Sequence, residues 1–133
     1  MKIIVGYDGS DHSKRALERA AVMAGDGDQI VVVAAAEPRV DTGITEGAHL
    51  NPSEIERRRR DLEEARAFLS ERGIDAETIL GQGDPGSVIV NAAKDADLVI
   101  VGTRGLNTVQ RLLMGSVSSK VVHRAPSDVI VVR

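Results

Sequence analysis

The chain has 133 residues, 42% of them hydrophobic, and a formal net charge of −3 at pH 7, which is the size and balance of one globular domain spanning residues 1–133. It has no cysteine, which excludes disulfides and fits a reducing compartment. The net negative charge argues against a nucleic-acid partner, and the apolar runs are too short for a secretory signal or a membrane span, so we expect a cytoplasmic protein.

Five apolar segments have the length and composition of β-strands. They are residues 2–7, 29–36, 74–80, 98–102 and 128–132, of which 74–80 has the weakest pattern. The other four are continuous apolar runs rather than alternating ones, and this is typical of strands covered on both faces.

Between these segments the hydrophobic period becomes helical. The apolar stripes of four expected helices are Leu17/Ala20/Ala21/Ala24, Ile55/Leu62/Ala65/Leu69, Val88/Ile89/Ala92/Ala93 and Val117/Val121/Val122. Ser10 suits the N-cap of the first helix, Asn51 or Ser53 the start of the second, and Pro85 the first turn of the third. Gly25 and Gly73 are expected to end the first two helices.

The alternation of strands and helices predicts an α/β fold: an open, parallel, five-stranded sheet in three layers, similar to a Rossmann fold. Such a sheet binds ligands in a crevice at the carboxyl ends of its strands. The long connection over residues 37–52 carries Pro, Gly and Asp, and we expect it to be mobile or to take shape when a ligand binds.

A run of four arginines, residues 57–60, lies within the second predicted helix and is surrounded by acidic residues. Spacings of four residues, such as Glu54 to Arg58, are those of stabilising ion pairs on a helix surface. We therefore expect a solvated helix face, with a patch that binds an anion or nucleic acid as the alternative.

The segment from Gly102 to Ser116 has the form G-x-x-G-x9-G-S, with its glycines at 102, 105 and 115. It leaves a strand and enters a helix, where glycine lets an anion approach the backbone and the first helical N–H groups point outward. Ser116 and Ser118 add hydroxyl groups at the same end. Two readings remain open: a phosphate cradle, or glycines that only end a strand, turn a loop and start a helix.

A second candidate lies at the end of the first strand, in the sequence Gly6-Tyr7-Asp8-Gly9-Ser10. Asp8 is placed to accept hydrogen bonds from ribose hydroxyls or to help hold a metal ion. The alternative is a turn in which its carboxylate bonds to its own backbone.

Other chemistry has little support in the sequence. There is no Walker A motif and no G-x-S-x-G elbow, and His12, His49 and His123 lack metal-ligand spacing. We expect His12 and His123 on helix surfaces. No general base is identified, so enzymatic activity stays open.

The sequence resembles the universal stress protein family from end to end. The resemblance rests on the G-x-x-G-x9-G-S motif, the first strand ending at Asp8, the Gly83-Asp84-Pro85 turn and the sequence ADLVIVGTRG at residues 96–105. In that family the glycine motif distinguishes ATP-binding members, so the resemblance implies ATP as the ligand, with Mg or Mn. It also implies strand order 3-2-1-4-5 and a homodimer formed through the last strand, residues 128–132.

The resemblance further implies a set of binding residues. Asp8 would lie near the ribose and adenine, Ala35 would contact adenine, and the glycine motif would hold phosphates and ribose. Arg104 departs from the usual family pattern and would pair with phosphate. The full expected set is Gly6, Tyr7, Asp8, Ala35, Gly102, Arg104, Gly105, Gly115, Ser116, Val117 and Ser118.

The resulting hypothesis is an ATP-binding regulatory protein of the stress response. Whether it also hydrolyses ATP slowly or phosphorylates itself at Ser116, Ser118 or Ser119 stays open. Two alternatives are an ATP-using enzyme that catalyses adenylation or phosphoryl transfer, and a ligand-free scaffold.

Overall fold

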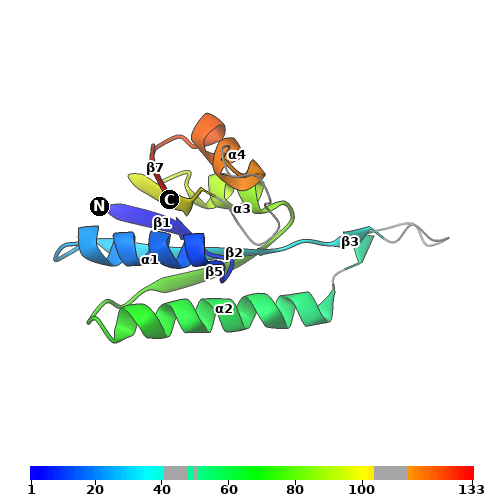
Figure 1. The fold of residues 1–133 in the computed structure, drawn as a ribbon, viewed down its shortest axis with the longest axis horizontal. Helices are drawn as coiled ribbons and strands as arrows, with labels where there is room; N and C mark the ends of the chain where they lie inside the picture. Colours follow the sequence, from blue (N-terminus) through cyan, green and yellow to red (C-terminus); the bar gives the residue numbers. More distant parts are fainter. Residues whose placement is uncertain (41–47, 50, 104–113) are drawn as a thin grey trace.

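A parallel five-stranded sheet forms the centre of the computed structural model, which describes residues 1–40, 48–49, 51–103 and 114–133 (Figure 1). The strands are β1 (Lys2–Gly6), β2 (Gln29–Ala36), β5 (Glu77–Gln82), β6 (Leu98–Gly102) and β7 (Asp128–Val132). Their order across the sheet is β5-β2-β1-β6-β7, and every neighbouring pair is parallel. When only the strands of this sheet are numbered along the chain, the order is 3-2-1-4-5, and the expected order is confirmed.

The weakest predicted strand has shifted bounds: 74–80 was expected, and β5 begins at Glu77. Gly73 has a φ of +75°, and the N–H of Ile74 donates to the carbonyl of Leu69 at 2.9 Å. Ile74 is thus used to close the end of the preceding helix, as in a glycine C-cap motif. Because the N–H of Ile74 is used in this hydrogen bond, β5 begins further along the chain, at Glu77.

The connection between β2 and the next helix contains two short strands that the sequence did not predict, β3 (Arg39–Val40) and β4 (Ala48–His49). They pair antiparallel to each other as a separate two-stranded sheet. Figure 1 shows β3 lying away from the central sheet. Residues 41–47 and 50 of this connection lie outside the described residues.

Within the described ranges, four helices cover the sheet: α1 (Asp11–Met23), α2 (Pro52–Ser70), α3 (Pro85–Ala92) and α4 (Ser116–Arg124). The expected caps are confirmed for Ser10, whose hydroxyl accepts from the N–H of Ser13, and for Asn51, whose side chain accepts from the N–H of Ser53. Asp84 caps α3 in the same way, ahead of Pro85 in the first turn.

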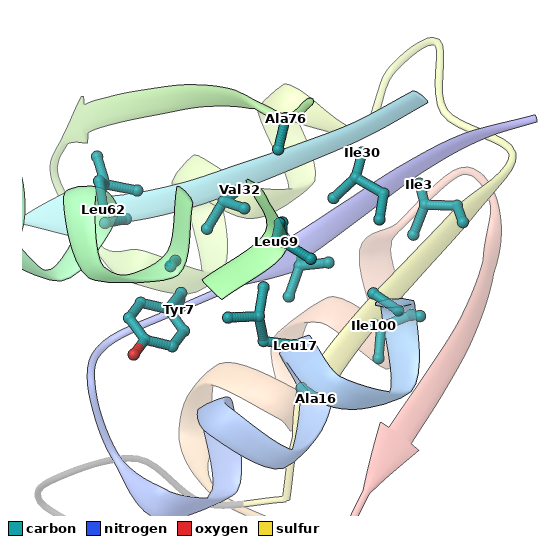
Figure 2. Packing of buried hydrophobic residues seen from close by; sticks show 14 of the residues in the cluster. Ile3, Tyr7, Ala16, Leu17, Ile30, Val32, Leu62, Leu69, Ala76 and Ile100 are labelled. Carbon is teal, nitrogen blue, oxygen red and sulfur yellow. The ribbon is translucent and has the colours of Figure 1, made fainter. Parts of the chain in front are cut away.

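Alternate residues of each strand pack on opposite faces, so there are two hydrophobic clusters. The first lies under α1 and α2 and includes Ile3 and Val5, whereas the second lies under α3 and α4 and includes Ile4. Figure 1 shows these two helix layers on either side of the sheet, and Figure 2 shows the first cluster. This is the three-layer arrangement expected from continuous apolar strands.

One residue of the predicted stripes was wrong. Val122 is 40% exposed, because Val121 is the residue of α4 that faces the sheet and is fully buried.

None of the helices in the described ranges combines the length with the apolar character needed to cross a membrane.

The sheet reverses its winding at β1, which lies between β2 and β6. The helix that follows β1 is α1, on one face of the sheet, and the helix that follows β6 is α4, on the other face. In open α/β sheets this is the position of the ligand crevice.

Candidate functional site

A cleft of about 410 Å³ opens at this carboxyl edge, between the ends of β1 and β6. Its volume falls within the range of roughly 300–1,000 Å³ that is common for small-molecule sites. The cleft is lined by Gly6, Tyr7, Asp8, Ser13, Val33, Ala35, Glu37, Glu54, Arg57, Arg58, Pro85, Ile89, Val101, Gly102, Thr103, Gly115, Ser116, Val117 and Ser118.

The β1 side of the cleft is the turn at Asp8 and Gly9. The carboxylate Oδ1 of Asp8 accepts from the N–H of Ser10 at 3.0 Å, and the N–H of Asp8 donates to the hydroxyl of Ser13 at 3.3 Å. The turn role that the sequence left open for Asp8 is therefore present. This hydrogen bond does not by itself exclude a ligand role for the same carboxylate, and that role remains a prediction.

Helix α2 brings a buried cation against this turn. Arg58 is only 7% exposed, and its Nη1 donates to the carbonyl of Asp8 at 3.3 Å. The same Nη1 lies 3.3 Å from Oδ2 of Asp61, as an ion pair. The expectation of a solvated face was thus wrong for Arg58, and its partner is Asp61 rather than Glu54. The other three arginines of the run are exposed.

The side chain of Asp61 is mostly buried beside Gly9. Burial raises the pKa of this carboxyl, and the positive charge of Arg58 opposes that rise. A Cβ on Gly9 would lie 2.9 Å from Oδ1 of Asp61, and Gly9 has a φ of +80°. Glycine is thus required at this position both by the backbone conformation and by the neighbouring carboxylate.

Tyr7 joins the cleft to the first hydrophobic cluster. Its ring packs with Leu17 and Leu62, and its hydroxyl lies at the edge of the cluster (Figure 2). The hydroxyl donates to Oε1 of Glu64 at 3.2 Å. Burial, together with the negative charge of Glu64, raises the pKa of Tyr7 well above its ordinary value, so the phenol stays protonated and acts as a donor.

The β6 side of the cleft is organised around the carbonyl of Thr103. This oxygen accepts from the N–H of Gly115 at 2.6 Å and lies 3.0 Å from the hydroxyl of Ser118. The hydroxyl of Ser118 is also 3.1 Å from the carbonyl of Gly115, and the residue is 1% exposed. These contacts fix the N-terminus of α4 against the end of β6.

The first turn of α4 faces the cleft, because residues 116–118 all line it. Gly115 is the N-cap, and glycine has no side chain with which to cap the helix. The first N–H groups of a helix have no partner within the helix and carry the positive end of its dipole. This end of the cleft therefore suits an anion.

His12 is not simply a surface residue, as the sequence analysis expected. Its Nδ1 lies 3.0 Å from Oγ1 of Thr103, and it is half-buried. A Cβ on Gly102 would lie 2.7 Å from the carbonyl carbon of His12. Gly102 thus allows α1 to pack closely on the end of β6, which is a structural reason for this glycine beside any role towards a ligand.

Helices α3 and α4 are joined at the same edge. Nζ of Lys120 lies 2.6 Å from Oδ2 of Asp84, and this hydrogen bond lowers the pKa of Asp84. A Cβ on Gly86 would lie 2.8 Å from the side chain of Lys120. The lysine therefore lies flat across the start of α3 and ties α4 to it.

Of the eleven residues expected from the sequence, the fold brings nine to one cleft: Gly6, Tyr7, Asp8, Ala35, Gly102, Gly115, Ser116, Val117 and Ser118. Arg104 and Gly105 lie outside the described residues. The roles of all eleven residues as ligand contacts remain predictions.

Sequence patterns did not predict that α2 and the segment after β2 contribute to the cleft. Glu37, Glu54, Arg57 and Arg58 line the cleft, and Oε1 of Glu54 accepts from the N–H of Glu37 at 3.2 Å. A signal was present in the run of arginines, but helical spacing alone did not indicate which of them turns inward. Within the described residues, no group of three or more His, Cys, Asp or Glu side chains is arranged to hold a metal ion.

The chain is similar in sequence and in fold to known proteins. Residues 1–133 match the family model described as the universal stress protein family. A universal stress protein of Thermus aquaticus is 40% identical over 136 residues, which cover 98% of this chain and 97% of that protein.

Two solved structures are similar over the whole of this chain. One is the universal stress protein from Archaeoglobus fulgidus in complex with dAMP, with a TM-score of 0.79, 26% identity and 98% of that chain covered. The other is a universal stress protein in complex with cAMP, with a TM-score of 0.75, 30% identity and 97% of that chain covered.

Proposed function

Because this chain belongs to the universal stress protein family, we propose that it binds an adenine nucleotide in the cleft between β1 and β6. We further propose that the nucleotide is ATP, accompanied by Mg or Mn. Binding of ATP would change the protein surface that partners recognise and so regulate their binding. The bound dAMP and cAMP of two similar structures support the adenine nucleotide as the class of ligand.

The observation that carries the proposal is that a helix N-terminus and a carboxylate line the same cleft. At one end lies the N-terminus of α4, whose N-cap is Gly115, with residues 116–118 lining the cleft. At the other lies the Asp8 turn, with its carboxylate. The helix end suits phosphate and a carboxylate suits ribose hydroxyls, so the cleft matches the two polar parts of a nucleotide.

The space between these ends suits a base and a sugar. Val33, Ile89 and Val101 line the cleft as apolar surface. A Cβ on Gly6 would lie 2.7 Å from Cδ1 of Ile89, so Ile89 packs directly on the backbone of Gly6. A flat aromatic base would be removed from water against this surface.

The first test is mass spectrometry of the purified protein for adenine nucleotide that copurifies with it, followed by calorimetric titration with ATP, AMP and cAMP. ATP is titrated with and without Mg or Mn. We expect ATP to bind and its affinity to increase with the metal ion. Preference for AMP or cAMP would retain the nucleotide site but overturn ATP as its ligand, and binding of none of the three would favour a ligand-free scaffold.

Catalysis is tested separately, by phosphate release and by mass spectrometry of the protein after incubation with Mg-ATP. Ser116 and Ser119 are the better candidates for autophosphorylation, because Ser118 is buried and its hydroxyl lies against two carbonyl groups. Binding without turnover is the result expected of a regulatory protein, and rapid turnover would favour the ATP-using enzyme.

We also propose a homodimer formed through β7. This strand is at one edge of the sheet, with β6 as its neighbour in the sheet. An edge strand carries backbone groups that a second copy can pair with. Sedimentation velocity at several protein concentrations tests this, and a monomer at all of them would contradict it.

A further inference from the structure

Arg58 is buried although it belongs to a run of arginines that are otherwise exposed. It is 7% exposed, whereas Arg57, Arg59 and Arg60 are exposed on the same helix. A guanidinium group stays charged at any physiological pH, so burying it carries a desolvation cost that only close partners offset.

The partners of Arg58 offset that cost only in part. Nη1 makes one hydrogen bond, to the carbonyl of Asp8, and one ion pair, to Asp61, each at 3.3 Å. Nε of Arg58 and Oδ2 of Asp61 are buried and form no hydrogen bond among the described residues. A buried pair with unsatisfied atoms is often no more stable than apolar residues of the same volume. Stability is therefore a weak reason for this pair to be here.

The geometry offers another reason for the pair, because Arg58 and Asp61 both lie against the turn formed by Asp8 and Gly9. Arg58 binds the carbonyl of Asp8, while Ser13 of α1 accepts from the N–H of the same residue. Asp61 packs against Gly9, the next residue of the turn. The backbone of Asp8 is thus held on its N–H side by α1 and on its carbonyl side by α2.

We infer that Arg58, supported by Asp61, is a positioning residue that orients the Asp8 carboxylate towards the ribose of the bound nucleotide. The inference rests on the proposed function and adds to it a residue on α2 that acts through Asp8. Without Arg58, the carbonyl of Asp8 loses its partner from α2, and the turn can rotate the carboxylate away from the cleft.

The test is calorimetric titration of the full chain with AMP, which avoids turnover of the ligand. Arg58→Met removes the charge and keeps the length of the side chain, and Arg59→Met is the matched control on the exposed face. We expect Arg58→Met to weaken AMP binding about tenfold and Arg59→Met to change it less than about twofold.

A double-mutant cycle separates positioning from direct contact with the nucleotide, because Arg58 itself also lines the cleft. In the Asp8→Ala background, Arg58→Met should change the affinity less than about twofold, since its effect passes through Asp8. An equal loss in both backgrounds would show that Arg58 acts on the ligand directly, and would overturn the inference.

A second variant guards against misfolding. Arg58→Met with Asp61→Leu removes both charges, so it should fold with stability close to wild type. We expect it to bind AMP as weakly as Arg58→Met, and wild-type affinity in this variant would overturn the inference. If wild type itself binds none of ATP, AMP and cAMP, the proposed function fails. If wild type binds and Arg58→Met binds equally well, only the role of Arg58 fails.

Discussion

The Nδ1 atom of His12 lies 3.0 Å from the Oγ1 atom of Thr103, so the first turn of α1 is bonded to the residue that follows β6. The carbonyl of the same threonine receives the N–H of Gly115 and lies within hydrogen-bond distance of the Ser118 hydroxyl. Thr103 therefore connects the β1 side of the cleft, through α1, to the N-terminus of α4.

Thr103→Val should loosen this connection without changing the volume of the side chain. We expect a loss of about 0.5–1.5 kcal/mol in the free energy of unfolding, the usual value of one hydrogen bond. ATP affinity should fall as well, because α4 becomes less firmly held. Urea denaturation and calorimetry measure the two effects. Thr78→Val, on β5 and away from the cleft, is the control for stability and affinity.

Gly102→Ala should destabilise the fold by about 1–3 kcal/mol, as overpacking usually does. The new Cβ would lie 2.7 Å from backbone and side-chain atoms of His12. Gly25→Ala is the matched control, since the nearest atom to its Cβ is Oδ2 of Asp28, at 3.7 Å. Equal stability of the two variants in urea denaturation would show that α1 can move away from β6 at little cost.

Gly115→Val should abolish ATP binding and leave the fold in place. The φ of Gly115 is −64°, which valine can adopt. A branched side chain at the N-cap would occupy the approach to the first N–H groups of α4. Circular dichroism checks the fold and calorimetry checks the binding, with Gly25→Ala again as control. Undiminished binding would place the phosphates elsewhere.

Asp8→Ala should weaken AMP binding by about 1.5–3 kcal/mol, the value of a hydrogen bond to a charged group. Asp11→Ala, at an exposed acidic residue of the first turn of α1, controls for the loss of one negative charge. If Asp8→Ala lowers stability while its affinity for AMP equals that of the control, the carboxylate serves only the turn.

Asp84→Asn tests the link between α3 and α4 through its dependence on pH. The hydrogen bond from Lys120 lowers the pKa of Asp84, so the folded state favours the ionised carboxylate. Its stabilising contribution is present above the ordinary carboxyl pKa of about 4 and is lost as the pH falls through the lower pKa of the folded state. Asparagine keeps the N-cap function, so the variant isolates the charge.

At pH 7 we expect wild type to be more stable than Asp84→Asn by about 0.2–1 kcal/mol, because the pair is partly exposed and screened by solvent. Urea denaturation at a series of pH values should show this difference decreasing below about pH 4. A difference that is constant with pH would mean that the ion pair contributes nothing and that asparagine alters the cap.

The bounds of β2, β6 and β7 and the caps at Ser10 and Asn51 were predictable from the sequence, because they depend on local properties. Continuous apolar runs indicate strands buried on both faces, and side chains that bond to the next turn indicate helix starts. The bounds of β5 were less predictable. Ile74 is apolar like a strand residue, but its N–H is needed to close α2 at Gly73.

The fold class followed from the sequence alone, and the family resemblance supplied the strand order and the residues that meet at the carboxyl edge. Tertiary packing was needed to show which arginine of residues 57–60 turns inward and that His12 reaches Thr103. The period of a helix places several side chains near its buried face, but it does not say what lies opposite them. Arg58 is buried because Asp8 and Asp61 lie within reach of its guanidinium group, and that proximity exists only once α2 has packed beside the turn after β1.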